Sequence, residues 1–202
     1  MTLRLAGSTS GYTEIDCPSV GGNNTLVLPT GNGSSGQVLS TNGSGALSWA
    51  GGGKLLQVVQ AFKSDTASGN SNAYTDVTGL SVSITPASTA NKILVMANIN
   101  ITSGGYFQGK IIRGTTDIAI GDAASLRTRS SFGGYNFGSF GGGFSFGVCK
   151  LDSPASTSSQ TYKLQIIATT SATWYINRGQ NDSDEANQGR QVSSITVMEV
   201  AA

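Results

Sequence analysis

Apolar and polar residues alternate with a period of two along most of this chain. In residues 92–101 one face carries only apolar side chains, namely Ile93, Val95, Ala97, Ile99 and Ile101. Asn98 and Asn100 fall on the other face. Successive side chains of a β-strand point to opposite sides of a sheet, so this pattern predicts a strand with one buried face.

Similar alternating rows recur farther along the chain. Their apolar positions are Leu80, Val82 and Ile84; Phe144, Phe146 and Val148; Tyr162, Leu164, Ile166 and Ala168; and Ala172, Trp174 and Ile176. Turn-forming residues separate the rows, and no window has the spacing of an amphipathic helix. We therefore predict an all-β protein in which two facing sheets form a sandwich, with roughly eight strands as in a jelly roll.

Residues 1–50 differ from the rest, because Gly and Asn interrupt the apolar pieces every few residues. Such short pieces cannot bury a core, so we expect them to become ordered only against another copy or a neighbouring protein. The sequence thus predicts three parts: an extended β arm at residues 1–50, a glycine linker at 51–53 and a jelly-roll head at 54–202. The apolar residues expected to dock the arm are Leu3, Leu5, Tyr12, Ile15, Leu26 and Leu28.

Charge is sparse and nearly balanced. Charged residues make up only 11% of the 202 residues, and the net charge is +1 without any block of Lys or Arg. Binding to a phosphate backbone usually needs such a block, so we expect no nucleic-acid partner. The longest apolar stretch, Ile93 to Ala97, is far shorter than the ~20 residues of a membrane helix, and we expect no membrane insertion. Because no signal-peptide pattern follows Met1, we expect synthesis in a cytoplasm.

The side chains used most often in catalysis are scarce. The chain has no His, which excludes Ser-His-Asp and Cys-His catalysis and His-ligated zinc. Its two cysteines, Cys17 and Cys149, do not suggest a disulfide framework, and we expect both to be small buried residues. We therefore expect no enzyme activity and no cofactor.

An acidic cluster is formed by Asp182, Asp184 and Glu185. It has three interpretations: a solvated loop, a weak Ca²⁺ site, or a carboxylate pair that hydrolyses glycans. The neighbouring Asn, Ser and Gly residues favour the solvated loop, since Ca²⁺ needs six or more oxygen ligands and this segment offers few.

Aromatic residues alternate with glycines in residues 132–144, which include Tyr135, Phe137 and Phe140. No Lys-Ser or Lys-Thr follows, so the segment is not a phosphate-binding loop. The aromatic rings either line the core or the axis of an oligomer, which we favour, or form a contact loop at an apex that stacks on sugar rings. Arg127 and Arg129, with Arg113 near in sequence, are either single surface residues, which we favour, or part of the same contact surface.

Several short motifs follow one another in a distinctive order. In the first part they are residues 7–15 (GSTSGYTEI), 22–29 (GNNTLVLP) and 36–43 (GQVLSTNG). Farther on they are residues 78–86 (TGLSVSITP), 112–116 (IRGTT), 151–154 (LDSP) and 194–200 (SITVMEV). Together they resemble structural and tail-fibre-like virion proteins of marine and cyanobacterial tailed phages, whose head is similar to the C1q and TNF jelly-roll trimers.

The resemblance implies a non-enzymatic, homotrimeric protein on the virion surface, in contact with the major capsid protein or with tail proteins. It leaves two roles open: a capsid decoration or cement protein, and a short tail fibre or fibre tip that binds a receptor such as a host-surface glycan. Many tail-fibre proteins carry a longer N-terminal attachment region than residues 1–50 provide, and this favours decoration. A glycan-degrading tailspike is disfavoured, because no convincing carboxylate pair is present.

Overall fold

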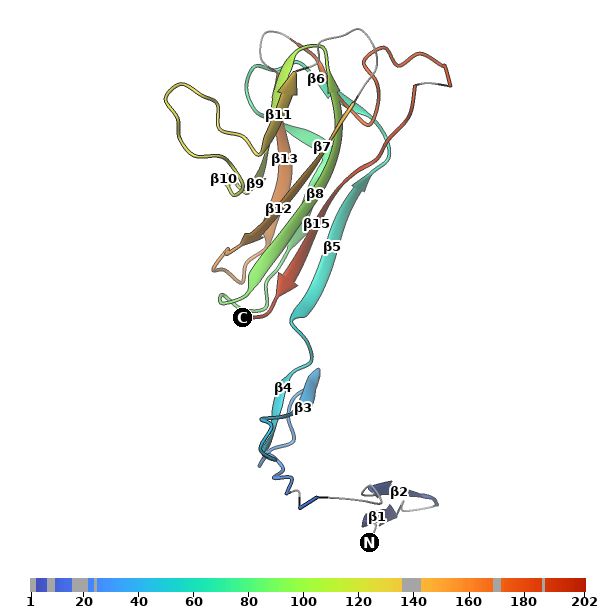
Figure 1. Ribbon diagram of the computed structural model, residues 1–202, viewed down its shortest axis with the longest axis vertical. Helices are drawn as coiled ribbons and strands as arrows, with labels where there is room; N and C mark the ends of the chain where they lie inside the picture. Colours follow the sequence, from blue (N-terminus) through green and yellow to red (C-terminus); the bar gives the residue numbers. More distant parts are fainter. Residues whose placement is uncertain are drawn as a thin grey trace. The chain divides into compact units, whose positions relative to one another are not determined.

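The structure is a computed structural model that describes residues 3–6, 10–15, 22–23, 25–135, 143–168, 172–186 and 188–202. These residues form β-strands and no helix (Figure 1), so the predicted all-β class is confirmed. Accordingly, the described part of the chain contains no helix long and apolar enough to cross a membrane. The chain divides into two compact units, Met1–Gly52 and Gly53–Ala202, which are described separately below.

The first unit contains two small antiparallel hairpins. Strand β1 (Leu3–Ala6) pairs with β2 (Tyr12–Ile15), and β3 (Gln37–Thr41) pairs with β4 (Leu47–Gly51). None of the side chains described in this unit is buried. Gly51 ends β4 and the Gly52 amide donates to the Gly36 carbonyl, so these two glycines of the predicted 51–53 linker belong to the second hairpin.

The second unit contains two antiparallel sheets. The five-stranded sheet is formed by β7 (Thr75–Ile84), β9 (Tyr106–Arg113), β10 (Thr116–Asp117), β11 (Phe132–Tyr135) and β13 (Gln160–Ala168). Its order is β7, β13, β9, and both β10 and β11 then pair with successive segments of β9.

The six-stranded sheet is formed by β5 (Leu55–Lys63), β6 (Ala67–Gly69), β8 (Lys92–Ser103), β12 (Phe144–Asp152), β14 (Trp174–Ile176) and β15 (Ser193–Val200). Strand β8 is its centre: it pairs with β12 along one edge and with β15 and then β14 along the other. The two sheets lie in a sandwich-like arrangement.

The core lies between the sheets and consists of the rows that alternation predicts. The row from Ile93 to Ile101 is buried along its whole length, as are the rows from Leu80 to Ile84 and from Tyr162 to Ala168. Phe144, Phe146 and Val148 of β12 pack against this core from a half-buried position. Strict alternation along long strands therefore identified most of the core correctly.

Candidate functional site

The acidic cluster does not bring three carboxylates together. Asp182 forms ion pairs with Arg190, at 2.9 Å from Nη2, and with Arg178, at 3.5 Å from Nη1. Asp184 and Glu185 are exposed. Among the described residues, no group of three Asp, Glu, Cys or His side chains is placed to hold a metal ion.

Cys149 lies on the outer face of β12 and is exposed, so the prediction that it is buried is wrong. The reason is strand alternation: Phe146 and Val148 pack toward the core, which turns the next position outward. The position of Cys149 in the alternation, and not its residue type, therefore determines its exposure. Cys17, the other predicted buried cysteine, lies outside the described residues.

Apolar side chains form a continuous row across the outer face of the six-stranded sheet. The strand registers place Val58 of β5 beside Met198 of β15, Met198 beside Leu94 of β8, and Leu94 beside Leu151 of β12. Val58 and Leu151 are 52% and 53% exposed, although both are large aliphatic residues. We call this row, together with the adjacent Leu56, Met96 and Cys149, the apolar face.

A hollow of about 520 Å³ opens on the same surface. It is lined by Met96, Ala97, Asn98, Gly147, Val148, Cys149, Ser194, Thr196 and Met198, none of which is charged. A side chain added at Gly147 would meet no atom within 4 Å, so this glycine helps to leave the space open. We call this the methionine hollow, because two flexible thioether side chains line it.

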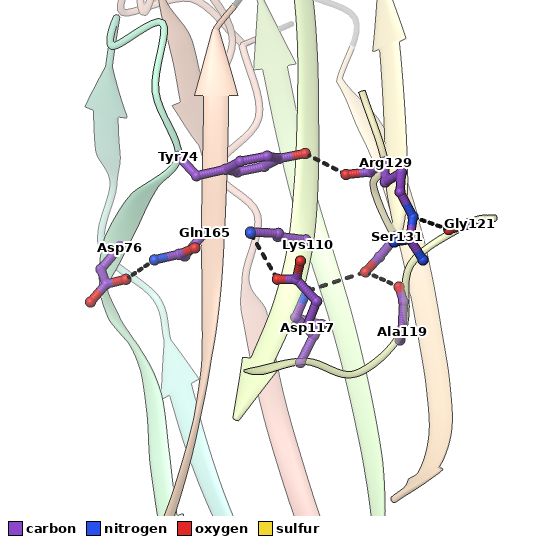
Figure 2. Close-up of polar contacts among 10 residues, drawn as sticks. Tyr74, Asp76, Lys110, Asp117, Ala119, Gly121, Arg129, Ser131 and Gln165 are labelled. Atoms are coloured by element: carbon purple, nitrogen blue, oxygen red, sulfur yellow. Dashed lines mark hydrogen bonds and ion pairs between the residues drawn. The ribbon is translucent and has the colours of Figure 1, made fainter. Parts of the chain in front are cut away.

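The outer face of the five-stranded sheet is polar instead (Figure 2). Asp76 accepts hydrogen bonds from Lys163 Nζ at 2.6 Å and from Gln165 Nε2 at 2.7 Å. Lys110 Nζ lies 2.7 Å from the Asp117 carboxylate and 4.4 Å from the centre of the Tyr74 ring. The two faces of the sandwich thus differ in character, one carrying paired charges and the other exposed apolar residues.

The segment between β10 and β11, residues 118–131, is a long loop fixed at its base (Figure 2). The Tyr74 hydroxyl donates to the Arg129 carbonyl at 3.0 Å, and Arg129 Nε donates to the Gly121 carbonyl at 2.7 Å. The Ser131 hydroxyl donates to the Ala119 carbonyl, and Ile118 packs against the core. These contacts hold both ends of the loop on the sandwich.

The tip of this loop presents Leu126, which is 100% exposed. Ser125 has a positive φ of 52°, and the Arg127 amide donates to the Ala124 carbonyl at 3.1 Å, so the tip is a tight turn. Leu126 could not be identified from the sequence, because a single leucine in a polar segment has no periodicity.

The structure separates the three predicted arginines. Arg127 is exposed at the loop tip, and Arg129 is exposed at the base with its Nε bound to a carbonyl. Arg113 instead forms a 2.7 Å ion pair with Asp152, and its side chain is mostly buried. Arg113 is therefore not part of an exposed contact surface, and the interpretation that joined all three is wrong.

Tyr135 of the predicted aromatic segment contacts a second tyrosine, Tyr106. Tyr135 pairs with Tyr106 across β11 and β9, and their ring centroids are 4.2 Å apart. They border a hollow of about 440 Å³, which is also lined by Phe107, Gln108, Ser130, Gly133 and Gly134. Phe137 and Phe140, predicted for the same contact loop, lie outside the described residues. Sequence reasoning missed Tyr106, because it precedes the aromatic segment by many residues.

This tyrosine pair lies at the end of the sandwich away from Lys54 and the C-terminus. The Ala201 amide donates to the Lys54 carbonyl, and the neighbouring Val200 pairs with Lys92 at the start of β8. Strand β8 then runs to Ser103, just before Tyr106, at the opposite end (Figure 1).

Six residues were predicted to dock the arm, and four of them lie in the first hairpin. Leu3 and Leu5 belong to β1, Tyr12 and Ile15 belong to β2, and Leu3 is opposite Ile15. The other two, Leu26 and Leu28, are 66% and 69% exposed and flank Val27, which forms an isolated bridge with Ala46. They are therefore free to contact another molecule.

A scan against protein-family models and a search of curated proteins found no match for this chain. In the described part of the chain, the prominent surface features are the apolar face, the anchored loop with Leu126 and the tyrosine pair. These features suit binding to other macromolecules.

Proposed function

We propose that this protein is a non-enzymatic structural protein on the surface of a tailed-phage virion, where it forms a homotrimer with projecting jelly-roll heads. The sequence resemblance supports the phage role, and the strand order supports the head. The eight strands β5, β7, β8, β9, β11, β12, β13 and β15, counted in that order, are arranged as 1-8-3-6 in one sheet and 2-7-4-5 in the other. Two interlocked Greek keys would give this order, so it supports the jelly-roll head that we propose.

The single observation that supports the proposed trimer most strongly is the exposed apolar face. Soluble monomers rarely expose a contiguous apolar patch of this kind, and such patches usually mark an interface. Removing 1,000 Å² of apolar area from water would contribute ~25 kcal/mol before the costs of association, at roughly 25 cal/mol per Å². Burial of this face between copies thus provides most of the free energy of trimer assembly.

Within the particle, we assign the protein to capsid decoration. The exposed Leu26 and Leu28 of the first unit dock on the major capsid protein, and the second unit projects from the shell. This role needs no catalytic group, only a stable fold and adhesive surfaces.

Two measurements test the proposal. Multi-angle light scattering of the purified protein should give three times the chain mass, and a stable monomer at micromolar concentration would contradict the trimer. Gel densitometry of purified particles should give a copy number comparable to that of the major capsid protein. A copy number matching the few fibres of a tail would contradict decoration.

One observation favours a second candidate, a short tail fibre or fibre tip that binds a host-surface glycan. The Tyr106 and Tyr135 rings border a hollow at the end of the sandwich farthest from Lys54. Aromatic rings with an apolar body and a polar tip are common at binding sites. If this candidate is correct, the copy number is low and the purified protein competes with phage for adsorption to host cells.

A further inference from the structure

The proposed homotrimer imposes a condition on the surface of each chain, and the present inference rests on that proposal. In a closed ring of three identical subunits, each contact is heterologous: one patch of a chain meets a different patch of the next chain. The apolar face is one of these two patches. The other must lie elsewhere on the same chain.

The described surface of the second unit offers few candidates for this patch. Outside the strands of the six-stranded sheet, its exposed large hydrophobic residues are Tyr106, Leu126 and Val192. Tyr106 packs against the ring of Tyr135, and Val192 directly precedes β15 of the six-stranded sheet itself. Leu126 alone is fully exposed, and it stands at the tip of a loop whose base is fixed by hydrogen bonds.

We propose that Leu126 of one copy docks into the methionine hollow of the next copy. The hollow, at about 520 Å³, accommodates a leucine side chain, and the thioethers of Met96 and Met198 adapt to its shape. No charged residue lines the hollow, so the neighbouring Arg127 meets no like charge there. Its guanidinium can donate to oxygen atoms at the polar rim, which includes Ser194 and Thr196.

The contact cannot form within one chain. The loop is tied to the five-stranded sheet, because the Ile111 amide of β9 donates to the Ser131 hydroxyl and Tyr74, which directly precedes β7, donates to the Arg129 carbonyl. The hollow lies on the outer face of the six-stranded sheet instead. The buried core separates these two surfaces, and the loop stands out from the sandwich (Figure 1). A loop on one surface and a hollow on another are the two unlike halves that a heterologous ring requires.

Cys149 lines the hollow and provides a direct test. In the full chain carrying Cys17→Ser, Leu126→Cys places a second thiol on the loop tip. A disulfide forms only when the two Cα atoms come within about 7 Å. Mild oxidation with copper phenanthroline should therefore yield covalent dimers and trimers on a non-reducing gel.

Three controls accompany this experiment. Leu126→Cys with Cys149→Ser should yield no trimer band, and neither should the Cys17→Ser parent. Thr157→Cys, in the exposed loop between β12 and β13, places a matched thiol away from the tip and should also give no trimer.

A second measurement needs no crosslink. Leu126→Asp should raise the concentration at which the trimer dissociates by about tenfold or more, because it brings a carboxylate to an uncharged apolar hollow. Ser125→Asp, at the same tip, should change that concentration by about twofold at most, since only the neighbouring side chain enters the hollow. Both variants should keep the circular dichroism spectrum of the parent.

The outcomes separate this inference from the trimer itself. If the parent protein is a trimer but Leu126→Cys does not crosslink to Cys149, or Leu126→Asp dissociates like the parent, the docking of Leu126 is wrong and the trimer stands. If the parent is a monomer by light scattering, both proposals fail.

Discussion

The hydroxyl of Tyr162 donates a 2.8 Å hydrogen bond to Oδ2 of Asp152, and this bond joins the two sheets. Tyr162 belongs to β13 of the five-stranded sheet, and Asp152 ends β12 of the six-stranded sheet. The same carboxylate oxygen lies 2.7 Å from Nη1 of Arg113. Burial and the bond to Asp152 both raise the pKa of Tyr162, so the phenol remains a donor at neutral pH.

Substitution of Tyr162 and substitution of Asp152 should both lower the unfolding free energy, but by different amounts. Tyr162→Phe removes one buried hydrogen bond and should cost about 1 kcal/mol of unfolding free energy. Asp152→Ala should cost more, about 3 kcal/mol, because it leaves both the Tyr162 hydroxyl and the Arg113 guanidinium without their acceptor. Urea unfolding of both variants measures the difference. Equal losses would show that the ion pair with Arg113 contributes nothing.

Glu199 gives a prediction about pH. It is almost fully buried, and its carboxylate accepts hydrogen bonds from Asn91 Nδ2 at 2.6 Å, Gln57 Nε2 at 2.6 Å and the Ala87 amide at 2.7 Å. Burial by itself would raise the pKa of Glu199, but the hydrogen bonds from Asn91, Gln57 and the backbone amides of Ala87 and Ser88 outweigh it and lower that pKa.

A carboxylate whose pKa is lower in the folded state stabilises the protein above its unfolded pKa of about 4.3. That stability is lost as the pH falls through the folded value. We therefore expect the unfolding free energy of the parent to exceed that of Glu199→Gln near neutral pH and the gap to narrow below about pH 4. A gap that stays constant from neutral to acidic pH would contradict this assignment.

Much of this architecture follows from the sequence, because long strands with strict alternation leave little freedom. The row from Ile93 to Ile101 is an example: its buried face was predicted and is confirmed. The apolar face could not be predicted in the same way. Val58, Met198, Leu94 and Leu151 come from four different strands. They form one row only through the pairing register, which local pattern does not determine.

The same row provides a matched pair of substitutions. Ile99 is fully buried, whereas the adjacent Asn98 is exposed on the outer face. Ile99→Asp should prevent folding, because an unpaired buried carboxylate costs several kcal/mol. Asn98→Asp should leave the protein folded, with the circular dichroism spectrum of the parent. Similar tolerance at both positions would show that the inward face of β8 is assigned incorrectly.

Gly109 and Gly147 differ in the space that is available for a Cβ atom, so we expect their substitution by Ala to affect stability differently. A Cβ at Gly109 would overlap the ring of Phe132, which is itself buried and packed against Phe146. A Cβ at Gly147 would meet nothing within 4 Å. Gly109→Ala should therefore lower the unfolding free energy by about 1 to 3 kcal/mol through overpacking. Gly147→Ala should cause no such overpacking and should keep the secondary structure of the parent. Circular dichroism and urea unfolding measure the secondary structure and the unfolding free energy of both variants.

We expect the acidic segment to hydrolyse no glycan. Hydrolysis by two carboxyl groups needs both to be held at a separation of roughly 5 to 10 Å on either side of the glycosidic bond. Asp182 is instead engaged by Arg178 and Arg190, and the guanidinium of Arg178 also lies 4.2 Å from the centre of the Tyr175 ring. Asp184 and Glu185 are exposed, and neither is fixed by an ion pair with a described residue.

We therefore expect purified protein to release no reducing ends from host lipopolysaccharide or capsular glycan. Asp184→Ala with Glu185→Ala should leave both stability and incorporation into particles unchanged. Asp182→Ala should lower stability by at most about 1 kcal/mol, because its ion pairs are partly exposed and weak. Release of sugar by the parent protein that disappears in the triple Ala variant would establish catalysis, since loss of a surface ion pair cannot by itself abolish an activity located elsewhere.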